Sequence, residues 1–199
     1  NIDGVIDDIS ISDGKIVANV SDKAKTIDAH GMAVLPGGVD IHCHIAGPKV
    51  NLARKLLPED HRLDPHPSTK HTRSGVGGIV PSTFATGYRY ATLGYTTAME
   101  AAVPPLVARH VLEELYDTPV IDTGYYVLLG NNIFLQKLIK QKKKKDFKDA
   151  VAWWLNASKG YTTKLVNPGG DEPWKGSKNK NVKDIDEESD MVDVSPRQV

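Results

Sequence analysis

The chain has 199 residues, which is enough for one domain or slightly more and for a sizeable hydrophobic core. Lys and Arg together number 25, as do Asp and Glu, so the formal net charge of zero argues against a nucleic-acid partner attracted by overall charge. Because Cys43 is the only cysteine, an intrachain disulfide is excluded and a reducing, cytoplasmic location is expected. The sequence contains no run of about 18 apolar residues, so we expect no membrane association.

The first 36 residues are expected to form a small unit of extended segments. Residues 8–20 carry alternating apolar side chains on both sides of Asp13-Gly14, a dipeptide typical of a two-residue hairpin turn. A second extended segment is expected at 26–38, where a Pro-Gly-Gly turn closes it. These features predict a strand-rich unit that ends near residue 36.

From residue 39 the pattern changes to strands that alternate with helices. Strands are predicted at 39–44, 95–100, 120–129 and 161–166. Helices are predicted at 82–93, where Gly94 ends the helix, at 106–116 after two prolines, and in two pieces around a run of lysines, the second at 147–160. About four βα units in succession imply a parallel sheet, which is either half of an eight-stranded barrel or most of a doubly wound sheet. The lysine run itself is expected to be solvated surface.

Two long segments lack the period of a helix or a strand. Residues 45–81 are rich in Gly, Pro, His and Arg, and a connection of this length is usually functional or disordered. Its three histidines are expected to be solvated loop residues, namely His61, His66 and His71. Residues 167–199 are polar and acidic, so they are expected to form a long loop or a frayed end.

The stretch PGGVDIHCH at 36–44 places two histidines one residue apart at the end of an apolar strand. Because residues two apart share a face of a strand, His42 and His44 are expected to converge, and imidazole is a natural zinc ligand. Cys43 lies between them and is expected to point toward the helix layer as a small packing residue. Of the other histidines, His110 is expected to be packed and hydrogen-bonded on the inner face of its helix, and His30 to lie in a turn.

Several longer motifs carry a family resemblance. The segments IDAHGMAV and PGGVDIHCHIAGPKVN resemble the amidohydrolase superfamily, whose members pair a small β-sandwich with a (β/α)8 barrel. More narrowly, the chain resembles the A subunits of formylmethanofuran dehydrogenases in IAGPKVNLAR, RSGVGG, VPSTFATGYRYATLGYTTAMEAAVPPL, GNN at 130–132 and KLVNPGG at 164–170. The resemblance covers nearly the whole chain.

The resemblance implies the fold class and the division of the chain. It implies an α/β protein, the first half of an amidohydrolase-type (β/α)8 barrel preceded by part of a small β-sandwich domain. Residues 1–36 would belong to the sandwich, residues 37–166 would form the first four βα units, and residues 167–199 would be a polar loop at a truncated end. We therefore expect the chain to be part of a longer protein.

The resemblance also implies a binuclear zinc site. His42 and His44 would supply two ligands, and Lys164, carboxylated by CO2 to N6-carboxylysine, would bridge the metals. Without the resemblance, Lys164 would be interpreted as an ordinary lysine at the rim of a strand. The catalytic aspartate and the further histidine ligands are expected beyond Val199, so no catalytic or substrate-binding residue is assigned in this chain.

The activity that the resemblance implies is the reversible hydrolysis of a formamide. The protein would condense formate with methanofuran in the one-carbon metabolism of methanogenesis. Its partners would be the other dehydrogenase subunits, first the one that carries a tungsten or molybdenum pterin, and the pterin and iron–sulfur centres would lie only in those partners. The 199-residue chain alone is expected to be inactive.

Three alternatives stay open at this point. The first is the formylmethanofuran hydrolase subunit of a bacterial formyltransferase complex, which would run the same site toward formate release. The second is a hydantoinase or dihydropyrimidinase acting on cyclic amides. The third is a non-catalytic remnant or assembly scaffold, because only three of the expected ligands lie in the chain.

Overall fold

The computed structural model describes residues 7–56, 70, 83–166, 184–186, 188 and 193–199. It divides into two compact units, Asn1–Gly37 and Gly38–Val199, which are described separately.

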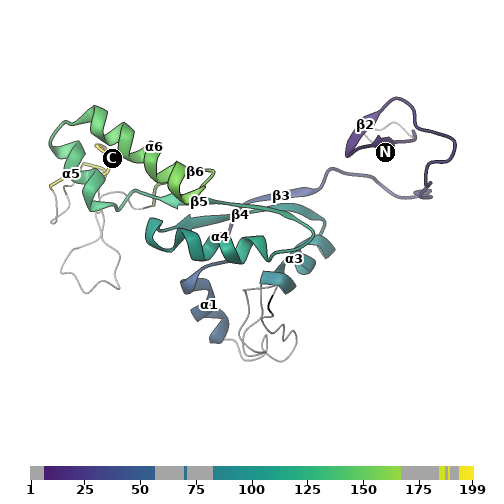
Figure 1. The fold of residues 1–199 in the computed structure, drawn as a ribbon, viewed down its shortest axis with the longest axis horizontal. Coiled ribbons are helices and arrows are strands. Elements are labelled where there is room, and N and C mark those ends of the chain that lie inside the picture. The colour runs from purple at the N-terminus through teal and green to yellow at the C-terminus, as the bar shows by residue number, and fades with distance from the viewer. Residues whose placement is uncertain (1–6, 57–69, 71–82, 167–183, 187, 189–192) are drawn as a thin grey trace. The chain divides into compact units, whose positions relative to one another are not determined.

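The first unit contains an antiparallel hairpin. Strand β1 (Ser10–Ser12) pairs with β2 (Lys15–Val17), as predicted (Figure 1). Asp13 and Gly14 join them with φ angles of 50° and 72°, the left-handed conformation that a tight hairpin turn requires. The second predicted segment, at 26–38, forms no strand before β3 begins at Gly38, which corrects that expectation. Its apolar side chains stay largely exposed, so no packed partner selects an extended pairing there.

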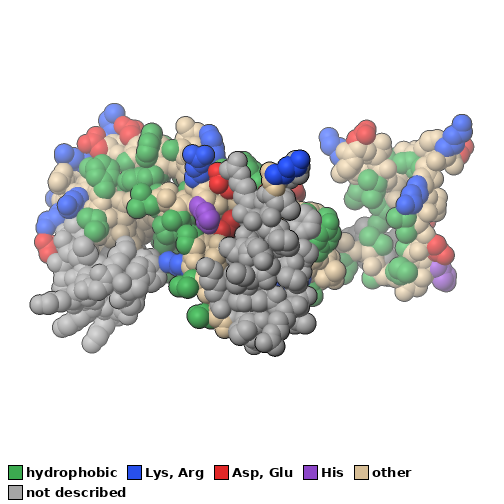
Figure 2. Space-filling view, turned by 60° about the horizontal axis from the view of Figure 1, so that its bottom comes forward, with side chains coloured by type: hydrophobic (Ala, Val, Ile, Leu, Met, Phe, Trp, Pro, Cys, Tyr) green, Lys and Arg blue, Asp and Glu red, His purple; other side chains and the backbone are tan. Residues whose placement is uncertain are grey.

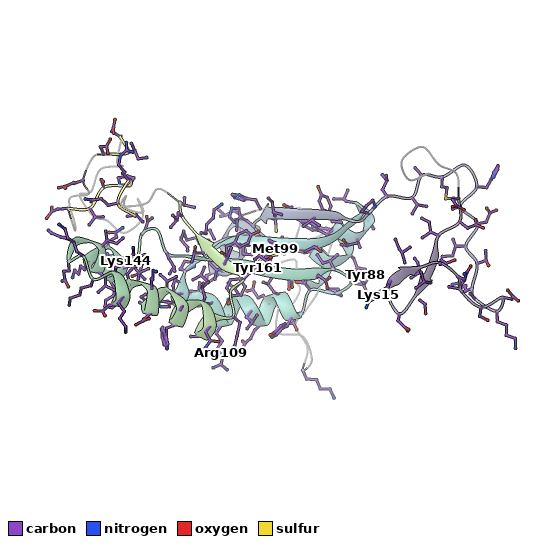
Figure 3. All side chains as sticks on the ribbon, turned by 90° about the horizontal axis from the view of Figure 1, so that it is seen from above. Lys15, Tyr88, Met99, Arg109, Lys144 and Tyr161 are labelled. Atoms are coloured by element: carbon purple, nitrogen blue, oxygen red, sulfur yellow. The ribbon has the colours of Figure 1, made fainter. Side chains whose placement is uncertain are left out.

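The second unit is built on a parallel sheet, as predicted. Its strands are β3 (Gly38–Cys43), β4 (Tyr95–Val103), β5 (Asp122–Leu128) and β6 (Thr162–Lys164). The strands are hydrogen-bonded in the order β3-β4-β5-β6, and each adjacent pair is parallel. Figure 3 shows them side by side, with the labelled Met99 on one of the central strands. The carboxyl ends of the strands therefore lie along one edge of the sheet.

Helices connect these strands and cover one face of the sheet. They are α1 (Pro48–Lys55), α3 (Thr83–Thr92), a short 3-10 helix η1 (Pro105–Val107), α4 (Ala108–Tyr116), α5 (Ile133–Lys140) and α6 (Lys144–Ser158). Figure 1 shows α1, α3 and α4 on the same side of β3 and β4. The hydrophobic core lies between sheet and helices and includes Ala98, Val111, Leu115, Tyr125, Val127 and Leu135.

Among the described helices, α1 was not predicted from the sequence. Helix α1 lies in the segment whose sequence shows little periodicity, and it begins with Pro48 directly after Gly47. Proline suits the first turn of a helix because its missing N–H would have no partner there. This helix contacts the loop that follows the two histidines, through Arg54 and the Ile45 carbonyl.

Other surfaces of this unit follow the sequence pattern. The lysines around α5 and α6 are exposed, and Figure 2 shows basic side chains scattered among acidic and apolar ones in that part of the surface. Strand β3 departs from that pattern, because its apolar residues Val39 and Ile41 are 58% and 65% exposed. Within the described residues, no helix is long and apolar enough to cross a membrane.

Candidate metal centre

The two histidines of the sequence motif lie together at the carboxyl end of β3. The ring centroids of His42 and His44 are 5.6 Å apart, and the rings are nearly perpendicular. Both residues are exposed, whereas Cys43 between them is buried and its Sγ donates a hydrogen bond to the Met99 carbonyl at 3.2 Å. The predicted facing of all three side chains is therefore confirmed.

The strand does not alternate regularly within the motif. Asp40 pairs with Ala98 and Cys43 with Glu100, so three steps along β3 match two along β4 and β3 carries an extra residue. The Tyr90 hydroxyl on α3 donates to Asp40 Oδ2 at 2.9 Å and also lies beside the Cys43 thiol. Asp40 and Cys43 thus reach the same helix although they are three residues apart.

Lys164 lies close to His42, although their strands β6 and β3 are the last and first in the sheet order. Its Nζ lies 3.5 Å from His42 Nδ1, although the two residues are 122 positions apart in the sequence. Lys164 is the last residue of β6, and its carbonyl accepts a hydrogen bond from the Leu129 backbone N–H at 3.1 Å. The structure therefore brings together all three residues that the sequence analysis assigned to the metal site.

The chemistry of these donors fits zinc in part. Imidazole nitrogens are common zinc ligands, whereas a lysine ammonium has no lone pair to offer. Lys164 fits only as a neutral amine or, once carboxylated, as an anionic oxygen donor; this modification stays a prediction. Among the described residues, His, Cys, Asp and Glu side chains form no cluster of three or more that could hold a metal ion.

A buried carboxylate that the sequence analysis did not identify lies next to His44. Glu100 on β4 is 2% exposed, and its Oε1 lies 2.9 Å from His44 Nδ1. Its Oε2 accepts hydrogen bonds from the backbone N–H groups of Ile45 at 2.6 Å and Ala46 at 3.1 Å. The sequence could have pointed to this residue, because Glu100 stands inside the apolar strand YTTAMEAAV and a buried charge needs compensating partners.

A second buried carboxylate holds the next residue of the same loop. Glu114 on α4 accepts from the Gly47 N–H at 2.8 Å, and its Oε1 accepts from Asn51 Nδ2 at 2.6 Å. His110 Nε2 lies 2.6 Å from that same oxygen. The prediction for His110 is half right, because the ring is hydrogen-bonded but its side chain is 54% exposed rather than packed.

Helix α1 also contacts this loop. Arg54 Nη2 donates to the Ile45 carbonyl at 2.5 Å, and its Nη1 donates to Asn51 Oδ1 at 3.0 Å. The loop at 45–47 is thus tied to β4, α4 and α1 immediately after the two histidines. The segment IAGPKVNLAR, which carried part of the family resemblance, supplies the residues for these contacts.

Comparisons with known proteins agree with this arrangement. The profile of the amidohydrolase family matches residues 25–197. The chain belongs to the amidohydrolase family. The predicted fold class, an α/β protein with a parallel partial-barrel sheet and a small antiparallel pair, is thereby confirmed.

Three relatives of this amidohydrolase chain are informative. Protein FwdA of Methanocaldococcus jannaschii is 47% identical over 198 residues, which cover 100% of this chain and 34% of the relative. The A component of the formyltransferase/hydrolase complex Fhc of Methylorubrum extorquens is 39% identical over 173 residues, which cover 85% of this chain and 31% of the relative. The crystal structure of the FhcABCD complex from that organism with methylofuran matches with a TM-score of 0.76 at 36% identity, covering 96% of this chain and 34% of the matched one. The chain thus spans about a third of the length of these relatives.

The environment of Cys43 in this amidohydrolase chain is that of an unreactive thiol. Burial raises the pKa of Cys43 to about 12, and the neighbouring Tyr90 hydroxyl lowers it by less. Burial also raises the pKa of Tyr90, and its hydrogen bond to Asp40 adds to the shift. Cys43 therefore stays protonated at neutral pH, in keeping with a packing role.

The predictions for the remaining histidines concern other parts of the chain. His30 is exposed and lies in a turn, as predicted, where its backbone N–H donates to Asp28 Oδ1 at 2.9 Å. The predictions for the long connection lie outside the described residues, since they concern His61, His66 and His71.

Proposed function

We propose that this chain is the N-terminal part of a formylmethanofuran dehydrogenase A subunit, which is an amidohydrolase that condenses formate with methanofuran and hydrolyses the resulting formamide. The observation that carries the proposal is the 3.5 Å approach of Lys164 Nζ to His42 Nδ1 between the first and last strands of the parallel sheet. The 47% identity to FwdA over the whole chain supports the assignment within the family.

The domain assignment follows from the same resemblance. We assign residues 1–36 to part of a β-sandwich, residues 37–166 to the first four βα units of the barrel and residues 167–199 to a polar loop. The remaining strands, the further histidine ligands and the catalytic aspartate would come from the rest of a longer protein.

In this proposal His42, His44 and Lys164 hold a binuclear zinc site. When bound, zinc supplies a water that ionises near neutral pH and polarises a carbonyl oxygen. The neutral Lys164 amine adds to CO2 and loses a proton, which turns a side chain that cannot ligate as an ammonium into an anionic oxygen ligand. The exposure of both histidines is consistent with a site open to substrate.

The reaction itself conserves oxidation state. Hydrolysis breaks the bond between the formyl carbon and the amide nitrogen, the water oxygen joins the carbon, and the amine takes up a proton. Condensation is the reverse of these steps. Reduction of CO2 to formate would take place in a partner protein with a tungsten or molybdenum pterin and iron–sulfur centres. The solved relative supports only the coarser point that such a chain works in a complex with other proteins, because it is part of the complex FhcABCD.

A second candidate is the hydrolase component of a formyltransferase/hydrolase complex. It is favoured by the 39% identity to the Fhc relative and by the TM-score of 0.76 to the FhcABCD structure. The two candidates share the same site and differ in direction and partners. Co-purification of the full-length protein from its own cells distinguishes them, because the first predicts a pterin-containing partner and the second a formyltransferase.

The decisive experiment replaces His42 by Ala in the full-length protein. We expect deformylation of formylmethanofuran to be abolished and zinc content to fall, while formate chemistry in the pterin-containing partner persists. His30→Ala is the matched control, because it also removes a histidine but from an exposed turn. Full formylmethanofuran hydrolysis by His42→Ala would contradict the zinc site. Lys164→Ala is expected to lose zinc as well, and bicarbonate is expected to promote zinc loading only while Lys164 is present.

A further inference from the structure

We propose that Glu100 is a positioning residue that fixes the imidazole of His44, with Nδ1–H directed at the carboxylate and Nε2 left free for a metal ion. This inference rests on the proposed function, because it concerns the same zinc site. It adds a residue from the neighbouring strand β4 whose role is to orient a ligand rather than to bind metal or substrate.

The hydrogen-bonding partners determine which nitrogen carries the proton. An ionised carboxylate only accepts hydrogen bonds, and Glu100 Oε1 lies 2.9 Å from His44 Nδ1. Nδ1 must therefore be the donor, so in the neutral ring Nε2 has a free lone pair. Histidines that ligate metals commonly use their second nitrogen in this way, which sets both the tautomer and the orientation of the ring.

Glu100 cannot easily turn away from this contact. Its other oxygen accepts the N–H groups of Ile45 and Ala46, which are each 4% exposed, and the Glu100 residue itself is 2% exposed. Rotation of the carboxylate would leave two buried N–H groups without an acceptor, which is unfavourable because a buried donor has no water to replace its partner. The loop contacts therefore hold the carboxylate in the orientation that His44 requires.

Glu100 orients only one of the two histidines. Among the described residues, His44 has a carboxylate partner for its ring, whereas the ring of His42 contacts His44 and approaches Lys164. The two ligands of one motif are thus oriented differently, His44 by a buried residue of β4 and His42 within the open part of the site.

Glu100→Gln in the full-length protein tests the proposal. The amide has nearly the same shape but offers one acceptor and one donor. If its oxygen keeps the Ile45 and Ala46 N–H groups, its NH2 faces His44 Nδ1, and the ring proton must move to Nε2. We expect zinc affinity, measured by competition with a chelator, to fall about 10–100-fold, the usual effect of losing such a partner. The visible absorption spectrum of the cobalt-substituted protein should change as well.

Glu114→Gln is the matched control. It makes the same chemical change at a second buried carboxylate that holds the same loop, through the Gly47 N–H, but Glu114 does not contact His44. We expect a much smaller loss of zinc affinity than in Glu100→Gln, because Glu114 acts on the loop and not on the His44 ring. An equal loss of zinc affinity in both variants, or no loss in Glu100→Gln, would overturn the positioning role.

A measurement on the unsubstituted protein covers the case in which Glu100→Gln does not fold. Nitrogen-15 chemical shifts of His44 in the metal-free protein should report a proton on Nδ1, and a proton on Nε2 alone would overturn the proposal. Wild-type protein that binds no zinc would instead refute the proposed function, and the positioning role with it. Zinc in the wild type together with normal affinity in Glu100→Gln would refute the positioning role alone.

Discussion

The two sides of the site are supported very differently by the rest of the chain. On the β3 side, three successive N–H groups after His44 are held by the buried side chains of Glu100 and Glu114. On the β6 side, Lys164 ends a strand of three residues, and its amine approaches His42 at 3.5 Å. The comparison teaches that residues of one proposed metal site need not be equally preorganised: the histidine side is fixed by buried contacts, whereas the lysine side is held mainly by backbone pairing.

The largest expected effect comes from removing a support on the β3 side. Glu114→Ala leaves the Gly47 N–H and the Asn51 amide without their acceptor, and we expect a loss of about 3 kcal/mol in the local free energy of opening. Hydrogen exchange of the peptide that contains residues 44–47 should then be about a hundredfold faster. Asp149→Ala is the control, because its pair with Lys145 is exposed and should contribute little. Unchanged exchange in Glu114→Ala would show that the loop is not held as described.

A backbone substitution in the same loop should have the next largest effect. Gly47 has φ of +101°, and a Cβ at this position would lie 3.0 Å from Val111 Cγ2. We expect Gly47→Ala to reduce the free energy of local opening by about 2 kcal/mol through strain and crowding. Gly14→Ala is the comparison, since its φ of +72° brings the strain but no atom lies within 4 Å of the new Cβ. An equal cost in the two variants, each measured by hydrogen exchange of its own segment, would rule out a contribution from the Val111 contact.

The thiol of Cys43 should make stability fall at alkaline pH. Burial raises its folded-state pKa from 9.0 to about 12, so the folded state holds the proton more tightly than the unfolded state does. The contribution of the protonated Cys43 thiol to the free energy of unfolding is complete below pH 9. It is lost as pH rises through about 12, and the free energy of unfolding falls by up to about 1.4 kcal/mol per pH unit. The free energy of unfolding of the full-length protein can be measured with urea between pH 8.5 and about 10. It should fall less steeply with pH in Cys43→Ala than in the wild type. Identical pH dependence in both proteins would contradict the raised pKa.

The smallest structural effect is expected on the β6 side. Lys164→Met keeps much of the length of the side chain and removes the amine, and we expect a change in local stability of no more than about 0.5 kcal/mol. The same variant should nevertheless lose zinc, because the thioether cannot be carboxylated. Hydrogen exchange across β6 and zinc analysis of one sample measure both outcomes. A large increase in exchange would show that Lys164 is a structural residue and would remove the contrast with the β3 side.

Much of the sheet and part of the site could be predicted from the sequence. The four strands, the Asp13-Gly14 hairpin and the common facing of His42 and His44 follow from local patterns that depend only on neighbouring residues. Lys164 was identified through the family resemblance, since its own surroundings are typical of any lysine at the rim of a strand.

The missed features depend on contacts between distant parts of the chain. Glu100 reaches residues 54 to 56 positions away, and Glu114 reaches Gly47 across 67 positions, so no local pattern pairs them. The extra residue in β3 is likewise visible only from the register with β4. The prediction for the segment at 26–38 failed for the opposite reason, because an apolar pattern suggests a strand but does not supply a partner.

The contacts of the loop at 45–47 also bear on substrate charge. A run of consecutive backbone amides is a common means of capturing a phosphate or carboxylate from solution. Here Glu100 and Glu114 already occupy those donors, so the loop is in effect an anion-binding nest saturated by the protein's own side chains. In the proposed function, a carboxylate substrate such as formate would gain no hydrogen bond from these amides. Beside His44 it would meet the Glu100 carboxylate, so its binding would depend on positive charge supplied elsewhere in the site.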